Sequence, residues 1–398
     1  MDMALVEAPR AAPLTRVPSI VVISDRIDWR DPHAPPFDHA RRWAALPPEE
    51  RPWQGTEAPR PEVTGGYLER LPLACIAAGM VEQAEIWHHQ RGGDPAPFAP
   101  VDPRLGYRAF RLDDPAAPFD NGDMLQFVQA FGAPHILVVY GLGVSAALLD
   151  ACADSIVVYN SIDAPTLRVP EAVSARFDLV LTGAQWQSDE VEARHPGKAT
   201  AIMPVGPEFA AIDLFRPLDT PKEYDLIYVA AAQPYKRHDI LLDAFARLPR
   251  EVRGLCVFGY GEDADRLRER IAAEGLSIDC IGPPGVPFAE VNRLMNAARF
   301  GVVCGRDDGA PAILTEYMLA GLPVLANAEL ACGREFILPE TGMLARAEAF
   351  ADGIMAMRER VGTFRPREAV LRRWTWPHTI ARFQAVLAGA GLKKVDLS

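Results

Sequence analysis

The feature that most constrains the fold of this 398-residue chain is a repeated alternation of short apolar runs with helix-like segments. Ser19–Ser24, His135–Tyr140, Ser155–Tyr159 and Asp178–Thr182 are near-continuous apolar runs, as expected for parallel strands covered on both faces. Further segments, a helix over 67–79 and a strand over 84–88, fit the same pattern. The alternation predicts an α/β chain built from doubly wound βα units.

A second series of the same kind follows residues 207–223, whose three prolines and weak periodicity predict an inter-domain linker. The strands predicted beyond it are 225–230, 255–258, 279–281, 300–304 and 324–326, and the helices are 240–248, 264–273, 291–298, 312–320 and 374–392. Two Rossmann-like domains in tandem are therefore the expected architecture. We divide the chain into a flexible N-terminus (1–16), an N-terminal domain (17–215), a C-terminal domain (216–375) and a terminal helix (376–398) that packs back toward the first domain.

The charge balance excludes several classes of partner. Lys and Arg count 41 and Asp and Glu count 53, a net charge of −12, so binding of nucleic acid or an anionic membrane over the whole surface is disfavoured. Any phosphate must bind in a local site. The six cysteines are scattered without a C-x-x-C pair, and residues 1–14 do not resemble a secretory signal, which together predict a cytoplasmic protein.

Two long segments need a separate interpretation. Residues 124–149 contain no Asp, Glu, Lys or Arg, but glycines and Pro134 interrupt them, which favours helix, strand and helix over the alternative of a membrane span. Residues 28–62 contain eight prolines and are expected to form a loop or lid, since loops of this length are usually functional or disordered.

The densest motif is the segment 304–327, CGRDDGAPAILTEYMLAGLPVLAN. Its turn Gly309–Ala310–Pro311 opens a predicted helix, whose unpaired N–H groups and dipole suit a diphosphate. Asp308 and Glu316 are eight residues apart near this end of the helix, where two carboxylates can accept hydrogen bonds from sugar hydroxyls. The alternative is an acidic first turn followed by an ordinary surface glutamate.

This segment resembles the signature of retaining GT-B glycosyltransferases, specifically glycosyltransferase family 4. The family signature is Glu, Gly, a small residue, Pro, four residues, and then Glu-Ala-Met-Ala-x-Gly-x-Pro-Val. This chain has Asp308-Gly-Ala-Pro-Ala-Ile-Leu-Thr-Glu316-Tyr-Met-Leu-Ala-Gly-Leu-Pro-Val324. The resemblance implies a GT-B fold, in which two Rossmann-like domains face each other across a cleft. It also implies that Glu316 holds the ribose hydroxyls of the donor nucleotide and that Asp308, or Asp307 beside it, faces the donor sugar. The backbone contacts to sugar and diphosphate would come from Gly309, Ala310, Pro311, Ala312 and Ile313.

Other segments occur in the same order as in the family. The stretch 228–248, YVAAAQPYKRHDILLDAFARL, resembles the opening of the family's second domain, which implies that Lys236 binds phosphate with Arg237 as a helper. The family's usual Arg is replaced by Ala231. Gly259 and Gly282 resemble its later donor-side turns. From the residues alone, a solvated cationic pair at a helix start is the alternative for Lys236 and Arg237.

The N-terminal domain resembles the family less closely. Gly65 and Gly66 precede a helix and resemble the glycine loop whose backbone meets the donor phosphates, although a plain turn is the alternative. The family often has a His after a central strand, and here the corresponding stretch, Tyr159–Asp163, contains none. We expect Asn160 or Asp163 to face the cleft on the acceptor side.

The prediction is a glycosyltransferase that moves a sugar from a nucleoside-diphosphate sugar to an unidentified acceptor with retention of configuration. Asp308, Lys236 and Arg237 are its predicted catalytic residues. By analogy with the family, the leaving diphosphate takes the acceptor's proton, and no cofactor or metal is expected. The acceptor would be a glycan, a lipid-linked sugar or a small molecule. A non-catalytic GT-B-like nucleotide-sugar-binding or partner protein is the alternative, suggested by Asp308, Ala231 and the missing His.

Three further patterns were weighed. Gly141 and Gly143 follow a strand and open a helix, and Asp163 comes 20 residues later, which leaves an NAD-dependent oxidoreductase as a third possibility. The pair Asp263 and Asp265 imitates a metal-binding D-x-D motif, but it lies in a first helical turn where acids are favoured anyway. The adjacent His88 and His89 point to opposite faces of a strand and do not form one metal site.

Overall fold

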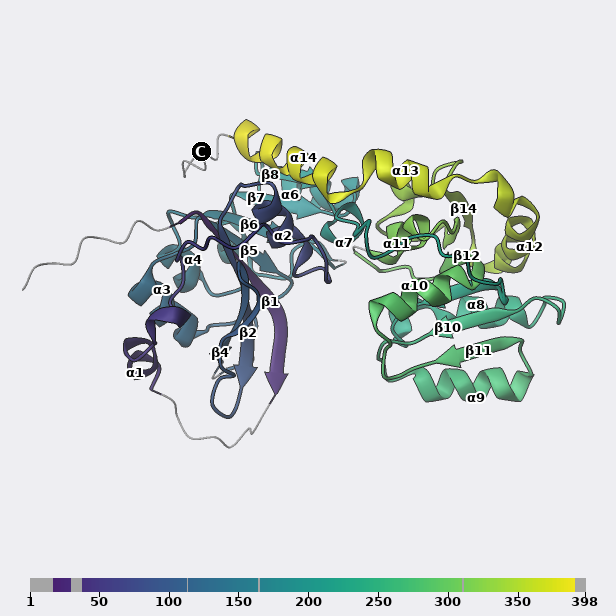
Figure 1. Cartoon of the computed structure of the whole chain (residues 1–398), viewed down its shortest axis with the longest axis horizontal. Helices are drawn as coiled ribbons and strands as arrows, with labels where there is room; N and C mark the ends of the chain where they lie inside the picture. The colour runs from purple at the N-terminus through teal and green to yellow at the C-terminus, as the bar shows by residue number, and fades with distance from the viewer. Residues whose placement is uncertain (1–16, 30–37, 113, 164, 310, 391–398) are drawn as a thin grey trace, which may run out of the picture.

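The computed structural model describes residues 17–29, 38–112, 114–163, 165–309 and 311–390, so the predicted flexible N-terminus lies outside the described residues. Figure 1 shows two α/β domains next to each other, with the N-terminal domain in purple to blue and the C-terminal domain in green. Each domain is built on a mostly or wholly parallel sheet. The predicted fold class, an α/β chain with two doubly wound βα domains, is confirmed.

The N-terminal sheet has the strand order β3-β4-β2-β1-β5-β6-β7-β8, and every neighbouring pair is parallel except β3 with β4. The chain reverses direction across the sheet at β1, which lies between β2 and β5. Ligands of open α/β sheets bind at the carboxyl ends of strands beside such a reversal. The strands are β1 (Ser19–Trp29), β2 (Gln83–Arg91), β3 (Ala99–Asp102), β4 (Leu105–Arg111), β5 (Ile136–Tyr140), β6 (Ile156–Asn160), β7 (Leu179–Thr182) and β8 (Ala199–Ile202).

Helices cover both faces of this sheet because its central strands are apolar on both sides. Along β1, Ile20 and Val22 enter one core while Val21 and Ile23 enter the other, and all four are at most 1% exposed. Asn121 caps α3 by accepting a hydrogen bond from the N–H of Met124 at 3.0 Å. The helices are α1 (His39–Ala44), α2 (Arg70–Ala77), α3 (Gly122–Phe131), α4 (Ala146–Ala151), α5 (Glu171–Ser174), α6 (Gln185–Arg194) and α7 (Val205–Glu208).

The proline-rich segment 28–62 differs from the expected loop. Residues 30–37 lie outside the described residues, but the rest contains α1 and the 3-10 helix η1 (Pro48–Glu50). Trp43 is 3% exposed, packs against Phe127 with ring centroids 4.7 Å apart, and donates its indole N–H to the carbonyl of Asp123. Burial of Trp43 therefore fixes this part of the segment to the N-terminal core, which proline content alone did not reveal.

The C-terminal sheet is parallel throughout, in the order β11-β10-β9-β12-β13-β14, and reverses direction at β9. Its strands are β9 (Tyr224–Val229), β10 (Gly254–Val257), β11 (Ile278–Ile281), β12 (Ala298–Val303), β13 (Val324–Asn327) and β14 (Gly342–Ala345). The α-helices are α8 (His238–Phe245), α9 (Ala264–Glu274), α10 (Phe288–Asn296), α11 (Ile313–Leu319), α12 (Phe350–Arg360), α13 (Pro366–Arg373) and α14 (Trp376–Gly389). Short 3-10 helices add η2 (Pro234–Lys236), η3 (Arg334–Phe336), η4 (Ala347–Ala349) and η5 (Val361–Thr363).

The chain passes between the domains twice. The first passage follows α7, and the second leads from α13 into α14, which lies across the N-terminal domain (Figure 1). The two passages are joined by a parallel β-bridge between Ala210 and Thr375. Phe383 of α14 is completely buried in the N-terminal core, and Arg382 forms a 2.5 Å ion pair with Glu208.

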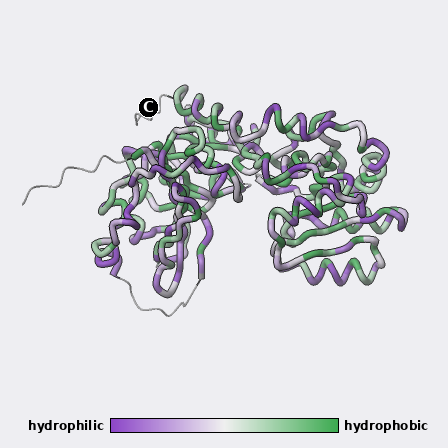
Figure 2. Tube along the Cα trace, in the orientation of Figure 1, coloured by the Kyte–Doolittle hydropathy of each residue, from purple (hydrophilic) through white to green (hydrophobic). Residues whose placement is uncertain are grey.

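The apolar stretch 124–149 folds as α3, β5 and α4, the helix–strand–helix arrangement that its glycines and proline predict. Among the described residues, no helix combines the length and hydrophobicity needed to cross a bilayer. Figure 2 shows hydrophobic segments inside both domains, whereas the outward-facing side of α9 is hydrophilic.

Candidate functional site

A cavity of about 430 Å³ lies between the two domains, at the carboxyl ends of the strands where both sheets reverse direction. The N-terminal domain contributes Asp25, Arg26, Gly66, Tyr67, Arg70, Ile162 and Asp163 to its lining. The C-terminal domain contributes Tyr235, Tyr260, Phe288, Asp308, Ala312 and Glu316. The two carboxylates that the motif singled out therefore share one cavity.

The turn before α11 presses directly on the N-terminal domain. A Cβ added to Gly309 would lie 2.3 Å from the carbonyl oxygen of Ile162 and 2.6 Å from the N–H nitrogen of Asp163. From the opposite side, a Cβ on Gly183 would lie 2.2 Å from the carbonyl oxygen of Gly309. Only glycine permits such close backbone approach. Ala310 lies outside the described residues, while Ala312 lines the cavity just before Ile313 begins α11.

Lys236 of η2, which follows β9, forms an ion pair with Asp308, which lies in the turn after β12. Burial by itself lowers the pKa of the Lys236 amine, but the Asp308 carboxylate outweighs it and holds that pKa above its ordinary value. The amine also lies 4.8 Å from the centre of the Tyr235 ring, and the Tyr228 hydroxyl donates to the Lys236 carbonyl at 2.5 Å. Lys236 is therefore a protonated ammonium group whose position is fixed by Asp308 and Tyr228.

Arg237 behaves differently from its neighbour. Its backbone is left-handed, with φ of 53°, and its guanidinium donates to the Asp239 carboxylate at 2.8 Å. The Arg237 side chain is 38% exposed and is not among the residues that line the cavity. The geometry therefore brings Lys236 to Asp308, whereas the head group of Arg237 is paired with Asp239.

Glu316 is held by a cation that the sequence interpretation missed. The carboxylate accepts a hydrogen bond at 2.5 Å from the guanidinium of Arg70, which belongs to the N-terminal domain. Arg70 is 1% exposed and Glu316 is 7% exposed. A charged residue at the start of the otherwise apolar helix α2, four residues after Gly66, was the available signal, but its partner lies 246 residues away in the chain.

The glycine loop lies at the edge of the same cavity, where Gly66 lines it and Gly65 has a positive φ of 82°. The Gly66 N–H donates to the Glu69 carboxylate at 2.7 Å, just before α2 begins. The Tyr107 hydroxyl donates to the other oxygen of Glu69. In this structure the loop N–H is therefore directed at an internal anion.

Asp25 and Asp163 form the acidic part of the N-terminal wall. Burial, reinforced by the nearby charge of Asp163, raises the pKa of Asp25. Asp163 is paired with Arg168 at 3.0 Å. Asn160 lies beneath them, fully buried beside Tyr140, so of the two predicted acceptor-side residues it is Asp163 that lines the cavity.

Gly259 and Gly282 lie in the turns that follow β10 and β11. Neither glycine lines the cavity. Tyr260, which follows Gly259, and Phe288, the first residue of α10, line it instead, and both are exposed aromatic side chains. Gly282 adopts a positive φ of 73° and a Cβ there would meet the Phe258 carbonyl at 2.1 Å, which explains the requirement for glycine.

The structure also places the glycine turn that resembles a dinucleotide-binding motif and the D-x-D pair. A Cβ on Gly141 would lie 2.3 Å from a carboxylate oxygen of Asp25, so an anion faces the glycine turn where a dinucleotide would place its pyrophosphate. Asp263 and Asp265 form ion pairs with Arg266 and Arg268, each at 3.0 Å. Within the described ranges, no three His, Cys, Asp or Glu side chains gather as a metal-binding cluster.

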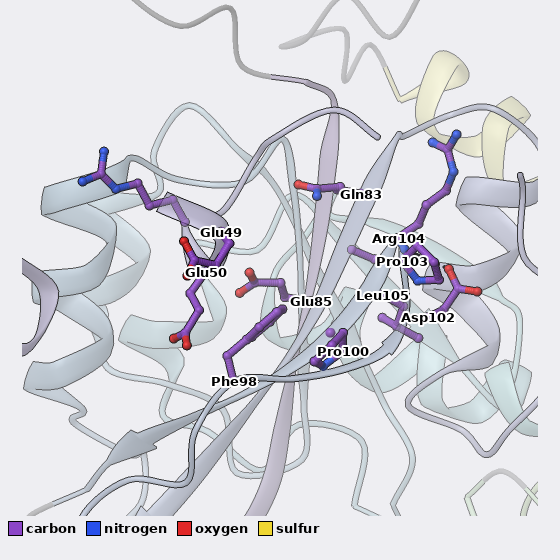
Figure 3. A pocket seen from close by; sticks show the side chains of 13 residues that line it. Glu49, Glu50, Gln83, Glu85, Phe98, Pro100, Asp102, Pro103, Arg104 and Leu105 are labelled. Atoms are coloured by element: carbon purple, nitrogen blue, oxygen red, sulfur yellow. Dashed lines mark hydrogen bonds between the residues drawn. The ribbon is translucent and has the colours of Figure 1, made fainter. Parts of the chain in front are cut away.

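A second cavity of about 390 Å³ lies at the amino ends of β2 and β4. Figure 3 shows Glu50, Glu85 and Phe98 on one side of it and Asp102 and Arg104 on the other. The Glu85 carboxylate is neutralised by Arg108 at 2.7 Å and accepts the indole N–H of Trp87. This second cavity lies at the amino ends of its strands, whereas ligands of such sheets bind at the carboxyl ends beside the reversal, so the inter-domain cavity is the stronger candidate.

Comparison with known proteins identifies the type of the C-terminal domain. Residues 212–359 match the model of the family described as Glycosyl transferases group 1, so the chain carries a domain of that type. The match covers β9 to α12 and includes Lys236, Asp308 and Glu316. No functionally curated protein matches the sequence.

Solved structures resemble the whole chain. Sucrose-phosphate synthase from Thermosynechococcus elongatus has a TM-score of 0.64 at 18% identity, covering 94% of this chain and 99% of that one. HepE of Anabaena, in complex with UDP and glucose, has a TM-score of 0.62 at 16% identity, covering 93% and 99%. The pneumococcal O-GlcNAc transferase GtfA, in complex with UDP and GlcNAc, has a TM-score of 0.55 at 13% identity, covering 67% of this chain. The chain spans 60% of the length of that transferase. At these identities the likeness defines the fold, which is GT-B.

Proposed function

We propose that this protein is a glycosyltransferase that transfers a sugar from a nucleoside-diphosphate sugar to an acceptor, with retention of anomeric configuration. The observation that carries the proposal is that Asp308 and Glu316 line one cavity between two doubly wound domains, with Lys236 ion-paired to Asp308. The family match over residues 212–359 supports it independently.

Each residue of the cavity has a distinct task in this proposal. Glu316 accepts hydrogen bonds from the ribose hydroxyls, and Lys236 binds the diphosphate as a charged ammonium. When the diphosphate competes for Lys236, the Asp308 carboxylate becomes available to hydroxyls of the donor sugar. The charge that develops on the leaving diphosphate is stabilised by Lys236 and by N–H groups at the start of α11.

Retention follows from attack on the same face that the diphosphate leaves. The acceptor hydroxyl then lies close to the departing phosphate oxygen, which takes its proton as the bond to the anomeric carbon forms. No protein base is assigned to this step. The acceptor would enter from the N-terminal wall, where Asp25 and Asp163 line the cavity. Contact between the two walls excludes water, which would otherwise hydrolyse the donor.

A non-catalytic nucleotide-sugar-binding protein remains the second candidate. Asp308 stands where the family signature has Glu, and Ala231 stands where it has Arg. The shorter Asp308 side chain is engaged by Lys236, so its reach toward a donor sugar depends on release of that ion pair.

The first experiment is a thermal-unfolding panel with UDP, GDP and their common sugar derivatives. A ligand at one hundred times its dissociation constant adds about 2.7 kcal/mol of stability. We expect Glu316→Ala to abolish this stabilisation and the matched surface variant Glu290→Ala, whose carboxylate pairs with Arg293 on α10, to retain it. If Glu316→Ala is stabilised as strongly as wild type, the ribose assignment is wrong.

The second experiment is a turnover assay with the donors that bind, across acceptors of different classes. Transfer, with the product's anomeric configuration matching the donor's by NMR, supports the proposal. Donor binding without turnover on any acceptor favours the non-catalytic alternative, and an inverted product contradicts retention.

A further inference from the structure

Arg70 joins three segments that come from different parts of the chain. Its Nε donates to the Gly65 carbonyl at 2.9 Å and its Nη1 donates to the Gly206 carbonyl at 3.1 Å. Its Nη2 donates to Oε1 of Glu316 at 2.5 Å. One guanidinium thus connects the glycine loop, helix α7 and helix α11.

A buried arginine is costly unless its charge is compensated and its N–H groups are bonded. The other side chains of α2, from Leu71 to Ile76, are buried and apolar, so an apolar residue at position 70 would suit the helix better. The Arg70 side chain nevertheless stays 1% exposed against a carboxylate of the other domain. Its position is explained by what it does to Glu316.

The contact leaves Glu316 prepared for a ligand. Arg70 engages Oε1, and the same carboxylate lines the cavity, so Oε2 is the acceptor that remains for an incoming diol. An ion-paired carboxylate with a fixed orientation loses less rotational freedom when it binds two hydroxyls.

We propose that Arg70 is a positioning residue for ribose recognition: it orients the Glu316 carboxylate toward the ribose hydroxyls and ties that recognition to the glycine loop. The proposal rests on the proposed function, because it assumes that a nucleotide occupies the cavity. Arg70 also lines the cavity, but each of its three guanidinium nitrogens donates to Glu316 or to a backbone carbonyl, so it acts on the nucleotide through Glu316. A merely structural link between the domains would instead support every ligand of the cavity equally.

The experiment separates these two roles by removing the ribose hydroxyls from the probe. Isothermal titration calorimetry measures the affinities of UDP and 2′,3′-dideoxy-UDP for the full-length wild type, Arg70→Gln, Arg70→Lys, Glu316→Gln and the Arg70→Gln/Glu316→Gln double variant. GDP and its dideoxy analogue are measured alongside. We expect Arg70→Gln to weaken UDP by about ten- to one-hundredfold, the range for loss of charge-assisted hydrogen bonds, and the dideoxy analogue by less than about threefold.

Two further results are expected if Arg70 acts through Glu316. The double variant binds UDP no more weakly than the weaker single variant, because both changes remove the same contact. Arg70→Lys restores part of the affinity for UDP, because it keeps the charge but not the forked geometry. If Arg70→Gln does not fold, Arg70→Lys carries the test by showing a smaller loss that is again selective for UDP over its dideoxy analogue.

The control is another inter-domain contact that does not reach Glu316. Trp186 donates its indole N–H to the Ala331 carbonyl at 2.9 Å, and Trp186→Phe removes that bond. Equal weakening of both nucleotides by Arg70→Gln, or the same selective loss in Trp186→Phe, overturns the role of Arg70 while leaving the proposed function intact. Failure of wild type to bind any of these nucleotides overturns the proposed function itself.

Discussion

At the scale of single residues, the two carboxylates that the C-terminal domain contributes to the cavity are each paired with a specific cation. Asp308 is paired with Lys236 and Glu316 with Arg70, over sequence separations of 72 and 246 residues. The motif and its resemblance to a family predicted three of these four residues. Arg70 could not be predicted, because only the folded arrangement of two domains brings a residue of α2 to a residue of α11.

Replacement of Lys236 tests the proposed diphosphate contact. We expect Lys236→Gln to weaken UDP by about 1.5–3 kcal/mol, because a charge-assisted contact is lost, and to weaken UMP less. Arg237→Gln should have a smaller effect, since its guanidinium is engaged by Asp239 at 2.8 Å. Calorimetric titration gives both affinities, and equal losses for the two variants would contradict the different placement of these cations.

The buried His238 predicts a dependence of stability on pH. Burial, with a contribution from the nearby Lys236, lowers the pKa of His238 to about 4. In the unfolded chain the His238 imidazole has its ordinary pKa of about 6.5, so the unfolded form binds this proton first as the pH falls. The contribution of neutral His238 to the free energy of unfolding is therefore fully present above about pH 6.5 and is lost progressively toward pH 4. The loss reaches about 2 kcal/mol at pH 5.

His238→Phe removes this titration while keeping an aromatic ring against Tyr228, whose ring centroid lies 4.7 Å from that of His238. We expect urea denaturation midpoints of the variant to fall less between pH 7 and pH 5 than those of wild type. Parallel falls in the two proteins would show that His238 is not responsible.

At the scale of elements, the sequence patterns located the central strands and the helices beside the cavity, and they missed the polar strand β4 and the edge strands β3, β8 and β14. In β4, the buried Arg108 interrupts the apolar run, and its compensation by Glu85 of β2 is visible only after folding. Strands β8 and β14 are not fully buried, and β3 contains Pro100 at an antiparallel edge. Physical patterning therefore identifies a buried strand more readily than an edge strand.

The turn before α11 allows a test at this scale. Gly309→Ala would place a methyl group 2.3 Å from the Ile162 carbonyl oxygen, so the turn and the N-terminal wall must separate. We expect a loss of about 1–3 kcal/mol in stability and weaker binding of UDP, as for other overpacked sites. The measurements are urea denaturation and calorimetric titration.

Gly362→Ala is the matched control in the same domain, because a Cβ there meets no atom within 4 Å. Its stability and UDP affinity should remain those of wild type. A Gly309→Ala protein as stable as Gly362→Ala, with unchanged affinity, would show that the close backbone approach is not required.

At the scale of the whole molecule, helix α14 ends the described chain but belongs to the core of the N-terminal domain. Ile380, Phe383 and Leu387 are at most 5% exposed and pack with residues of α2 and the first sheet. Hydrophobic periodicity predicted a packed terminal helix. Periodicity alone could not establish which apolar groups of the N-terminal domain it meets.

We expect Phe383→Ala to destabilise the N-terminal domain by about 3–5 kcal/mol, the usual cost of removing a buried aromatic ring. The exposed neighbour Gln384 lies on the same helix, and Gln384→Ala should change stability by less than about 0.5 kcal/mol. Hydrogen exchange of the N-terminal core, measured for both variants, checks this. Increased exchange confined to the C-terminal domain would contradict the role of α14.

The bridge between Ala210 and Thr375 ties the two inter-domain passages to each other. Two connections joined at one bridge would allow the domains to rotate about that bridge, and they would oppose twisting or sliding of one domain past the other. Each opening and closing would then retrace one path and return the two walls to the same alignment. In the proposed transferase, chain connectivity would thus set the orientation of the reacting groups in the same way each time the domains close.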